Sequence, residues 1–451
     1  VVRATLPGNR LPEEGADPAQ LLDQATQLLT RHSLFNGHPR FAGYVTSPAS
    51  PIGSLAELLA STINANLGAW ILSPMATEIE LQTIRWIAQL IGYPADTGGV
   101  LVSGGNMANF VGFLVARHTK ADWAIRENGL CATQARNLRV YASREVHTWL
   151  HKAADLFGLG TDNIRWVDVN GDQTVDLKDL KKALEHDRRA GDLPFLIVGS
   201  AGTVSTGAVD PIAELRDLSD EFGAWLHIDG AYGALAAASP DRPEPLTRLE
   251  LADSVALDPH KWLYAPLEAG CALVRDAEAM RATFSYRPPY YKMDEVAGEP
   301  TVDFIDYSPQ NSRGFRALKV WLALRQVGRK GYAQMISDDM RLARLLFDLA
   351  RSHDELEAHT LNLSITTFRY VPVDLQIAIE ANEAYLNRLN ESLLTELQES
   401  GKAFLSNAVI EGRYLLRACI VNFRTGTEDV RAIVEVVVTL GRKLHTSCQS
   451  E

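Results

Sequence analysis

Seven short apolar runs cross the middle of the chain, and they constrain its fold more than any other feature. They lie at positions 99–103, 138–142, 164–169, 195–200, 224–229, 254–258 and 270–275. Because apolar residues occupy successive positions, both faces of the strand that each run forms must be buried. Strands of this kind, separated by helices, are typical of parallel sheets covered on both sides. The sequence therefore predicts an α/β fold with a mainly parallel seven-stranded sheet.

Helical patterns accompany these runs, and a second group of strands follows them. Helices are expected at about 177–186, 211–222, 314–327, 377–400 and 427–444. The segments LNLSITTFRYV and YLLRACIVNFR predict strands of a separate, smaller sheet. We therefore expect three parts: an N-terminal arm over 1–50, a large domain over 51–330 and a small C-terminal α+β domain over 331–451.

The N-terminal arm has one helical pattern near 20–30, followed by a segment rich in Pro and Gly. Such a segment is typical of a chain that runs extended over a surface. Two further helices are expected after the arm, at 55–63 and 78–91. Thr77 and Glu80 have the spacing of a capping box, in which both side chains bond to backbone N–H groups at the start of a helix. They therefore predict where the second of these helices begins.

Composition and charge exclude several classes of function. The chain has 451 residues, of which 46% are hydrophobic and 22% charged, as in ordinary folded proteins. Its net charge is -12 and it has no basic cluster, so we expect no nucleic-acid partner. No run approaches the roughly 18 apolar residues of a membrane span, and the first residues do not resemble a signal peptide. We therefore expect no membrane partner.

Metal and disulfide chemistry is not expected either. The four cysteines form no C-x-x-C pair, which argues against a zinc ribbon or a disulfide framework. His147 and His151 have the spacing of half a metal site, but no carboxylate or third histidine completes it. Cysteine usage of this kind suits a reducing compartment, and we expect a cytoplasmic protein.

Polar residues stand where four of the predicted strands end. They are Ser103–Asn106, Gly202–Thr203, Asp229 and Asp258–Lys261. Ligands of parallel sheets bind beyond the carboxyl ends of the strands. We therefore expect these groups to surround one site.

Each of these groups also has a plainer interpretation. The glycines of SGGNMAN, at 103–109, could cradle a phosphate at the start of a helix or could serve turn geometry alone. Asp229 could pair with a protonated ring nitrogen or cap a turn. Lys261 could be an amine nucleophile or could extend to solvent. Taken together, however, a phosphate cradle, an aspartate and a lysine in this order match the needs of pyridoxal phosphate.

The sequence resembles the group II pyridoxal-phosphate decarboxylases, which act on aromatic amino acids, glutamate, cysteine sulfinate or diaminobutyrate. The resemblance extends from about 38 to 424. It rests on HPRFAGYVTS, GAWILSPMATEIE, SGGNMAN, REVHTWLHKAADLFG, GSAGTVSTGAVDP, HIDGAYGA, DPHKWLYAP and SRGFRALKVW, which occur in the order of that family. It implies the fold in which a large pyridoxal-phosphate domain carries a small C-terminal domain.

The resemblance implies roles for the residues that would surround the cofactor ring. Lys261 would bind the cofactor covalently through its amine. Asp229 would face the ring nitrogen, and His147 would stack on the ring and touch the substrate carboxylate. Ala231 would pack against the opposite face of the ring, and Thr203 would form a hydrogen bond near the ring and Asp229.

The cofactor phosphate would be held by a second set of residues. Gly105, Asn106 and His260 match the residues that hold it in the family. Asp258 stands beside them at a position where animal relatives often carry Asn. This difference concerns the detailed hydrogen bonding around the cofactor.

Four further residues would act on the substrate. Tyr290 matches a loop tyrosine that returns a proton after carbon dioxide leaves, although the neighbouring Tyr291 allows a shift by one residue. Arg417 matches an arginine that binds the α-carboxylate in some members, or it could be an ion-pair residue on a strand edge. Tyr44 and Trp70 lie where relatives line the side-chain pocket.

The resemblance implies decarboxylation of an L-amino acid to its amine and carbon dioxide. The residues at the side-chain pocket are the aromatic Tyr44 and Trp70 with their aliphatic neighbours Val45 and Ile71. They favour an aromatic substrate, and Arg40 is the one candidate for a second carboxylate. Alternatives are an acidic or other amino acid substrate, or an aldehyde synthase on the same scaffold. An aminotransferase and a non-catalytic cofactor carrier also remain open, whereas a nicotinamide site lacks its glycine motif. We further expect a homodimer whose N-terminal arms cross.

Overall fold

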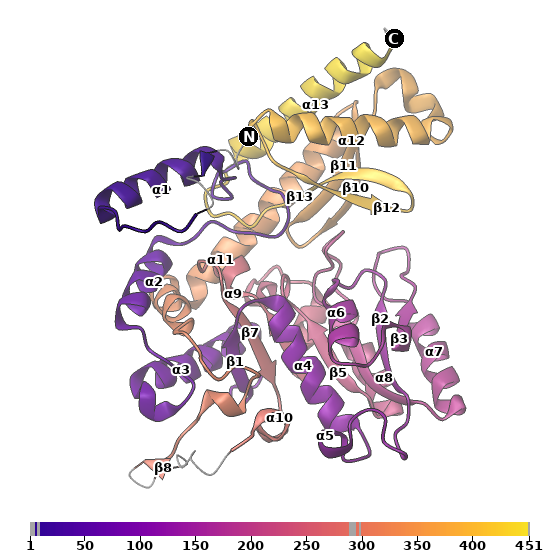
Figure 1. Cartoon of the computed structure of the whole chain (residues 1–451). Helices are drawn as coiled ribbons and strands as arrows, with labels where there is room; N and C mark the ends of the chain where they lie inside the picture. The colour runs from indigo at the N-terminus through magenta and orange to yellow at the C-terminus, as the bar shows by residue number, and fades with distance from the viewer. Residues whose placement is uncertain (1–4, 7–9, 288–294, 297–298, 450–451) are drawn as a thin grey trace.

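The structure is a computed structural model, and it describes residues 5–6, 10–287, 295–296 and 299–449. Two sheets form its framework (Figure 1). The larger sheet and its helices occupy the lower part of the view. The smaller sheet lies above it, next to α12 (Glu383–Glu399) and α13 (Thr427–Gln449).

The larger sheet has the seven strands predicted from the apolar runs. They are β1 (Gly98–Val102), β2 (Leu138–Ser143), β3 (Ile164–Val167), β4 (Leu193–Ser200), β5 (Trp225–Asp229), β6 (Ser254–Leu257) and β7 (Gly270–Val274). Their order across the sheet is β1-β7-β6-β5-β4-β2-β3. Strands β2 to β6 pair in parallel, whereas β7 runs antiparallel between β6 and β1. The prediction of a mainly parallel seven-stranded sheet is confirmed.

Helices cover this sheet and connect its strands. They are α2 (Pro51–Ile63), α3 (Pro74–Ile91), α4 (Gly105–Lys120), α5 (Ile125–Asn128), α6 (Trp149–Leu156), α7 (Leu177–Ala190), α8 (Ile212–Phe222), α9 (Pro259–Trp262) and α10 (Ala277–Phe284). The connection between β5 and β6 differs from the others, because it consists of 3₁₀ helices at Ala234–Ala238 and Glu244–Leu251.

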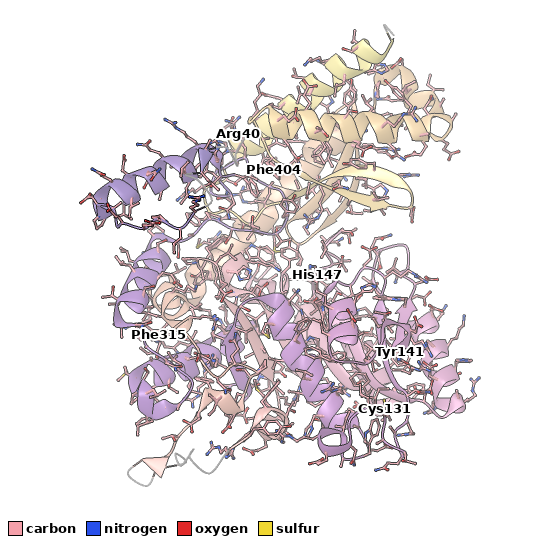
Figure 2. The ribbon with its side chains drawn as sticks, viewed as in Figure 1. Arg40, Cys131, Tyr141, His147, Phe315 and Phe404 are labelled. Atoms are coloured by element: carbon pink, nitrogen blue, oxygen red, sulfur yellow. The ribbon has the colours of Figure 1, made fainter. Side chains whose placement is uncertain are left out.

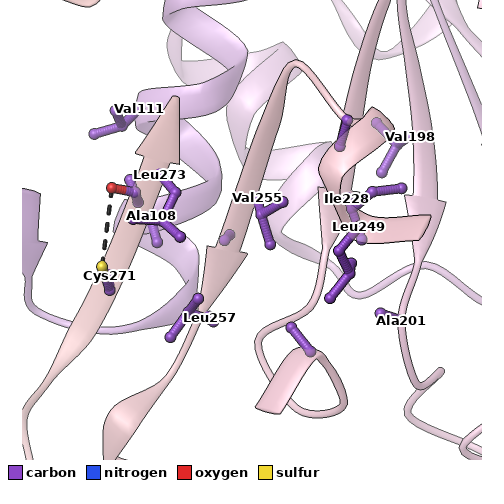
Figure 3. Close-up of a cluster of buried hydrophobic side chains, with 14 of the residues drawn as sticks. Ala108, Val111, Val198, Ala201, Ile228, Leu249, Val255, Leu257, Cys271 and Leu273 are labelled. Carbon is purple, nitrogen blue, oxygen red and sulfur yellow. Dashed lines mark hydrogen bonds between the residues drawn. The ribbon is translucent and has the colours of Figure 1, made fainter. Parts of the chain in front are cut away.

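Apolar side chains between the sheet and its helices form the main core (Figure 3). Val255 on β6 and Leu273 on β7 are at most 1% exposed, as are Ala108 and Val111 on α4. Burying a valine or leucine side chain stabilises the fold by about 1.5–3 kcal/mol relative to exposing it. This packing holds the carboxyl ends of the strands in fixed relative positions.

A long helix, α11 (Ala317–Ser352), leads from the large sheet to the small one. Its backbone leaves the helical conformation at Gly328, where φ is 68°. The boundary expected at about 330 falls just after this kink. The small sheet that follows is antiparallel, in the order β10-β11-β13-β12. Its strands are β10 (Leu356–Asn362), β11 (Ile365–Tyr370), β12 (Ser406–Ile410) and β13 (Arg413–Cys419).

The capping box predicted from Thr77 and Glu80 is wrong. Helix α3 begins earlier, with Ser73 as its N-cap residue, and the Thr77 hydroxyl donates to the carbonyl of Ser73 within the helix. Glu80 is fully buried, where it pairs with Arg313 and accepts a hydrogen bond from the backbone N–H of Leu101 on β1 at 3.0 Å. A buried carboxylate needs a cation, and that need outweighs the local cap.

The N-terminal arm contains α1 (Pro18–His32), in which no residue is buried. After α1 the arm packs on the smaller sheet. The rings of Phe41 and Phe404 stack there, with their centroids 4.9 Å apart. Within the described ranges, no helix is both long and apolar enough to cross a membrane.

Candidate active site

A cavity of about 450 Å³ opens at the carboxyl ends of the parallel strands. Nine residues predicted to bind the cofactor line it: Gly105, Asn106, His147, Thr203, Asp229, Ala231, Asp258, His260 and Lys261. They come from segments far apart in the sequence, and the sheet brings them together. Figure 2 shows one of them, His147, where the large-sheet and small-sheet halves of the molecule meet.

Lys261 is placed by the short helix α9, which begins immediately after β6. Asp258 is its N-cap residue and Pro259 its first residue, a position where the missing N–H of proline costs nothing. The Nζ atom of Lys261 lies 3.0 Å from Oδ2 of Asp258. The second oxygen, Oδ1, is buried and has no hydrogen-bond partner among the described residues. Asp258 is therefore held by the lysine and keeps acceptor capacity in the cavity wall.

His260 lies on the opposite side of the same turn. Its Nδ1 atom donates to the carbonyl of Ala269 at 2.7 Å, and its Nε2 atom is 3.5 Å from Oδ2 of Asp258. Burial lowers the pKa of His260 below its ordinary value, and Asp258 opposes this in part. The Ser47 hydroxyl from the N-terminal arm donates to the carbonyl of His260 at 2.7 Å. The arm thus helps to fix the turn that carries the lysine.

The turn between β1 and α4 can hold an anion. Gly104 has φ 130°, a conformation that favours glycine, and α4 begins at the next residue. A Cβ atom at Gly105 would lie 2.9 Å from Oδ2 of Asp258 and 3.0 Å from Cβ of Ala231. Glycine therefore leaves open the space in front of the helix N-terminus, where backbone N–H groups and the helix dipole favour a phosphate.

Asp229 ends β5 and is 8% exposed. Its Oδ2 atom accepts a hydrogen bond from Nε1 of Trp149 at 2.7 Å, and its Oδ1 atom accepts one from the backbone N–H of Ala231 at 3.2 Å. No described Lys, Arg or His forms an ion pair with it. A buried carboxylate without a cation has a place for a protonated ring nitrogen.

Trp149 is the functional neighbour that sequence reasoning missed. It is the first residue of α6 and is fully buried. Its partner Asp229 is 80 positions away. The only signal in the sequence was its place two residues after His147 in the EVHTW motif.

His147 and Thr203 complete the cavity wall around Asp229. The Nδ1 atom of His147 accepts the backbone N–H of Trp149 at 3.3 Å, so the proton of a neutral ring resides on Nε2. Desolvation lowers the pKa of His147, and the charge of Asp229 raises it in part. The Thr203 hydroxyl is buried and lies 3.0 Å from that of Thr206.

Among the predicted substrate residues that the structure describes, Val45 lines the cavity, whereas Tyr44, Trp70, Ile71 and Arg417 do not. Tyr44 is 59% exposed, and its carbonyl accepts a hydrogen bond from Nη1 of Arg417 at 3.0 Å. Arg417 is 2% exposed, and its Nε and Nη2 atoms are buried without a partner among the described residues. The indole Nε1 of Trp70 donates to Glu78 at 2.9 Å. Tyr290 lies outside the described residues.

Comparison with known proteins identifies the family. The model of the pyridoxal-dependent decarboxylase conserved domain matches residues 3–371. The chain belongs to the pyridoxal-dependent decarboxylase family. It is therefore a pyridoxal-phosphate-dependent amino acid decarboxylase, a carboxy-lyase, and the resemblance inferred from the sequence motifs is confirmed.

Relatives of this decarboxylase act on different amino acids. An aromatic-L-amino-acid decarboxylase of Bacillus atrophaeus is 34% identical, over 97% of this chain and 88% of its own length. An L-2,4-diaminobutyrate decarboxylase of Acinetobacter baumannii is 28% identical, over 87% and 78%. The crystal structure of Oryza sativa TDC with PLP and tryptamine superposes with a TM-score of 0.89 at 28% identity, covering 97% of this chain and 90% of that one.

The cavity of this decarboxylase fits pyridoxal phosphate. The backbone of Gly105 begins α4 in the cavity lining, and a helix N-terminus suits the phosphate. The cation-free carboxylate of Asp229 suits the ring nitrogen, and Lys261 supplies an amine in the same cavity. The donor set therefore matches each charged part of the cofactor.

Proposed function

We propose that the protein decarboxylates an aromatic L-amino acid to the corresponding amine and carbon dioxide. The observation that carries this proposal is that the cavity contains both the amine of Lys261 and the buried, cation-free carboxylate of Asp229. Bound pyridoxal phosphate supplies an electron sink for the pair released when the bond between Cα and the carboxylate breaks. The relative that is 34% identical acts on aromatic amino acids.

Each of these cavity residues would then have its own role in binding the cofactor and the substrate. Lys261 would hold the cofactor covalently through its amine. Asp229 stabilises positive charge on the ring nitrogen. His147 covers the ring and orients the substrate carboxylate, while Ala231 packs on the opposite face. Thr203 forms a hydrogen bond at the edge of the ring.

Phosphate binding would use the opposite end of the cavity. The backbone at Gly105 and Asn106 presents N–H groups at the start of α4. His260 lies beside this helix terminus, since its Cε1 atom would be 3.4 Å from a Cβ placed on Gly104. Asp258 forms an ion pair with Lys261 beside the proposed phosphate site.

Arg417 is proposed to bind the substrate α-carboxylate. It is a buried cation with two unpartnered donor atoms among the described residues, and a buried charge of this kind requires an anion. Its Nη1 atom bonds to Tyr44, next to Val45 in the cavity wall. A decarboxylase substrate always brings a carboxylate to this region.

Substrate identity is proposed from the rest of the lining. Val45, Met107, Phe110 and Leu267 are apolar and contribute to the cavity wall, which favours an aromatic side chain. Arg40, the candidate for a second carboxylate, instead pairs with Asp429 at 3.9 Å. In Figure 2 it lies near Phe404, away from His147. This arrangement favours an aromatic over an acidic substrate.

Two measurements test the proposed reaction. Borohydride reduction of the holoenzyme followed by peptide mapping should place the cofactor on Lys261, and a label on another lysine would overturn the assignment. A panel of L-amino acids should release most carbon dioxide from an aromatic member. Equimolar amine identifies a decarboxylase, whereas aldehyde with ammonia and peroxide identifies the synthase alternative.

The protein is further proposed to be a homodimer. Helix α1 buries none of its residues in the single chain. Large apolar side chains of α1, α2, the 3₁₀ helix Trp70–Leu72 and the start of α3 are also exposed, including Leu22, Leu29, Leu55, Leu58, Ile63, Leu72 and Met75. An apolar surface of this extent is typical of an interface. We propose that the partner subunit covers it and that Trp70, which adjoins it, completes the partner's cavity.

A mixed dimer tests this arrangement. Lys261→Ala and Trp70→Ala subunits should each be inactive or weakly active alone. If Trp70 serves the partner's cavity, refolding them together creates dimers with one intact site, and activity returns. If it serves its own chain, no intact site forms. Light scattering that shows a fully active monomer would contradict the dimer.

A cytoplasmic location is also proposed. Cys131, Cys271 and Cys419 are free thiols, as in proteins of reducing compartments. Fractionation of the source cells with an antibody to this chain would test the location.

A further inference from the structure

The side chain of Trp149 contacts Asp229, the residue that is proposed to face the ring nitrogen of the cofactor. Its side chain is fully buried, and its Nε1 atom donates to Oδ2 of Asp229 at 2.7 Å. The indole N–H can only donate, so this bond exists only when Oδ2 is an acceptor. A donor of this type stabilises the ionised carboxylate relative to the neutral acid. It also leaves Oδ1, which accepts a single bond from Ala231, directed to another partner.

His227, two residues before Asp229 on the same strand, is a buried titratable group whose protonated form would compete for that charge. Its Nδ1 atom is 2.7 Å from the hydroxyl of Ser254, and its Nε2 atom is 2.7 Å from Oδ1 of Asn109. The indole of Trp225 also donates to that hydroxyl, at 2.8 Å. The amide oxygen of Asn109 can only accept, so Nε2 donates to it, and in the neutral ring Nδ1 then accepts the proton of the Ser254 hydroxyl.

Burial favours the neutral form of His227. Its ring is fully buried, and desolvation lowers its pKa to about 4, although the charge of Asp229 opposes this. The rings of Trp149 and His227 pack edge to face, with their centroids 5.7 Å apart and an interplanar angle of 78°. A Cβ atom on Gly112 would lie 2.5 Å from the ring, so a glycine in α4 makes room for it. The histidine thus packs beside Asp229 without neutralising it.

We propose that Trp149 is a positioning residue that acts through Asp229. Its N–H group fixes the position of Oδ2, while the ring of His227, engaged by Ser254 and Asn109, makes no ion pair with the carboxylate. The negative charge of Asp229 is thereby reserved for the ring nitrogen of the cofactor. This inference rests on the proposed role of Asp229 and adds a residue that the sequence motifs do not assign.

Trp149→Phe tests the proposal, because phenylalanine keeps an aromatic ring but removes the N–H donor together with part of the indole. Hydrogen bonds to charged groups are strong, so we expect cofactor affinity to fall roughly tenfold to hundredfold. Equilibrium titration of the apoprotein with pyridoxal phosphate, followed by absorbance, measures it. The catalytic constant should fall as well, with little change in KM for the amino acid. The matched control is Trp123→Phe, which removes a buried indole bond of 2.9 Å to the carbonyl of Gly129, outside the cavity lining.

A double-mutant cycle separates this role from general packing. In an Asp229→Asn background, Trp149→Phe should lower cofactor affinity much less than in the wild type, because the charge that it serves is gone. Thermal unfolding of each apoprotein shows whether the variants fold. Wild-type affinity in folded Trp149→Phe, or an equal loss in both backgrounds, overturns the inference. Failure of the wild-type chain to bind pyridoxal phosphate would instead refute the proposed function.

Discussion

The Nζ atom of Lys261 lies 3.0 Å from Oδ2 of Asp258, its neighbour three positions earlier. Both side chains are largely buried, with 17% and 3% of their surface exposed. This ion pair holds the amine of the lysine that is proposed to bind the cofactor. The amine must leave this partner before it can bind the cofactor covalently.

Asp258→Asn should therefore speed covalent attachment of the cofactor. The amide cannot form this ion pair, so the amine is released more readily, and we expect the rate to rise roughly tenfold, which corresponds to about 1.4 kcal/mol in the barrier. Stopped-flow absorbance after mixing apoprotein with pyridoxal phosphate measures the rate. Asp338→Asn is the control, since Asp338 pairs with the exposed Arg341 at 3.3 Å. A slower rate in Asp258→Asn would show that the carboxylate assists attachment instead.

Gly105→Ala should weaken cofactor binding. The added methyl group would meet Asp258 and Ala231 at 2.9 and 3.0 Å, so the turn in front of α4 must shift. Overpacking of this kind costs about 1–3 kcal/mol, which corresponds to roughly a tenfold to hundredfold loss of affinity. Equilibrium dialysis measures the loss. In Gly171→Ala the new methyl group meets nothing within 4 Å, and affinity should stay unchanged.

Asp339→Asn should change how stability depends on pH. Asp339 accepts hydrogen bonds from Trp262 and Tyr264, both at 2.8 Å, and burial raises its pKa from 3.8 to about 7. Between these values the folded protein keeps a proton that the unfolded chain has released. The free energy of unfolding should therefore fall as pH rises through this window, by up to about 1.4 kcal/mol per pH unit.

Urea denaturation of wild type and Asp339→Asn at several pH values checks this expectation. The difference in unfolding free energy between the two proteins cancels the other titrating groups. It should decrease from pH 4 to 7 and then level off. A difference that is constant over this range would show that Asp339 is ionised throughout.

Tyr290→Phe tests the loop tyrosine, which lies outside the described residues. General acids typically contribute about 10²–10⁴-fold, so amine formation should fall by a factor in that range while carbon dioxide release continues. Aldehyde, ammonia and peroxide should appear in place of the amine. Tyr291→Phe should change little. If the two variants exchange these outcomes, the alignment of the loop is wrong by one residue.

Much of the fold could be predicted from local sequence. All seven strands of the large sheet were recognised because each is a short apolar run, and short-range composition decides whether both faces of a strand can be buried. In the small sheet, by contrast, LNLSITTFRYV was expected to be one strand. The turn between β10 and β11 interrupts it at Leu363, where φ is 48°. Leucine rarely adopts this conformation, so composition gave no sign of the turn.

For the candidate site, too, local sequence predicted some features and tertiary packing decided the others. The sequence by itself determined which groups stand at the strand ends, because Asp229 and Lys261 follow apolar runs directly. Only the tertiary structure decided their partners. The indole of Trp149 reaches Asp229 from 80 positions away, and Arg313 withdraws Glu80 from the helix start where its spacing would place it. Local pattern specifies the element that a residue joins, whereas a buried charge takes whatever partner the packing of distant segments brings within reach.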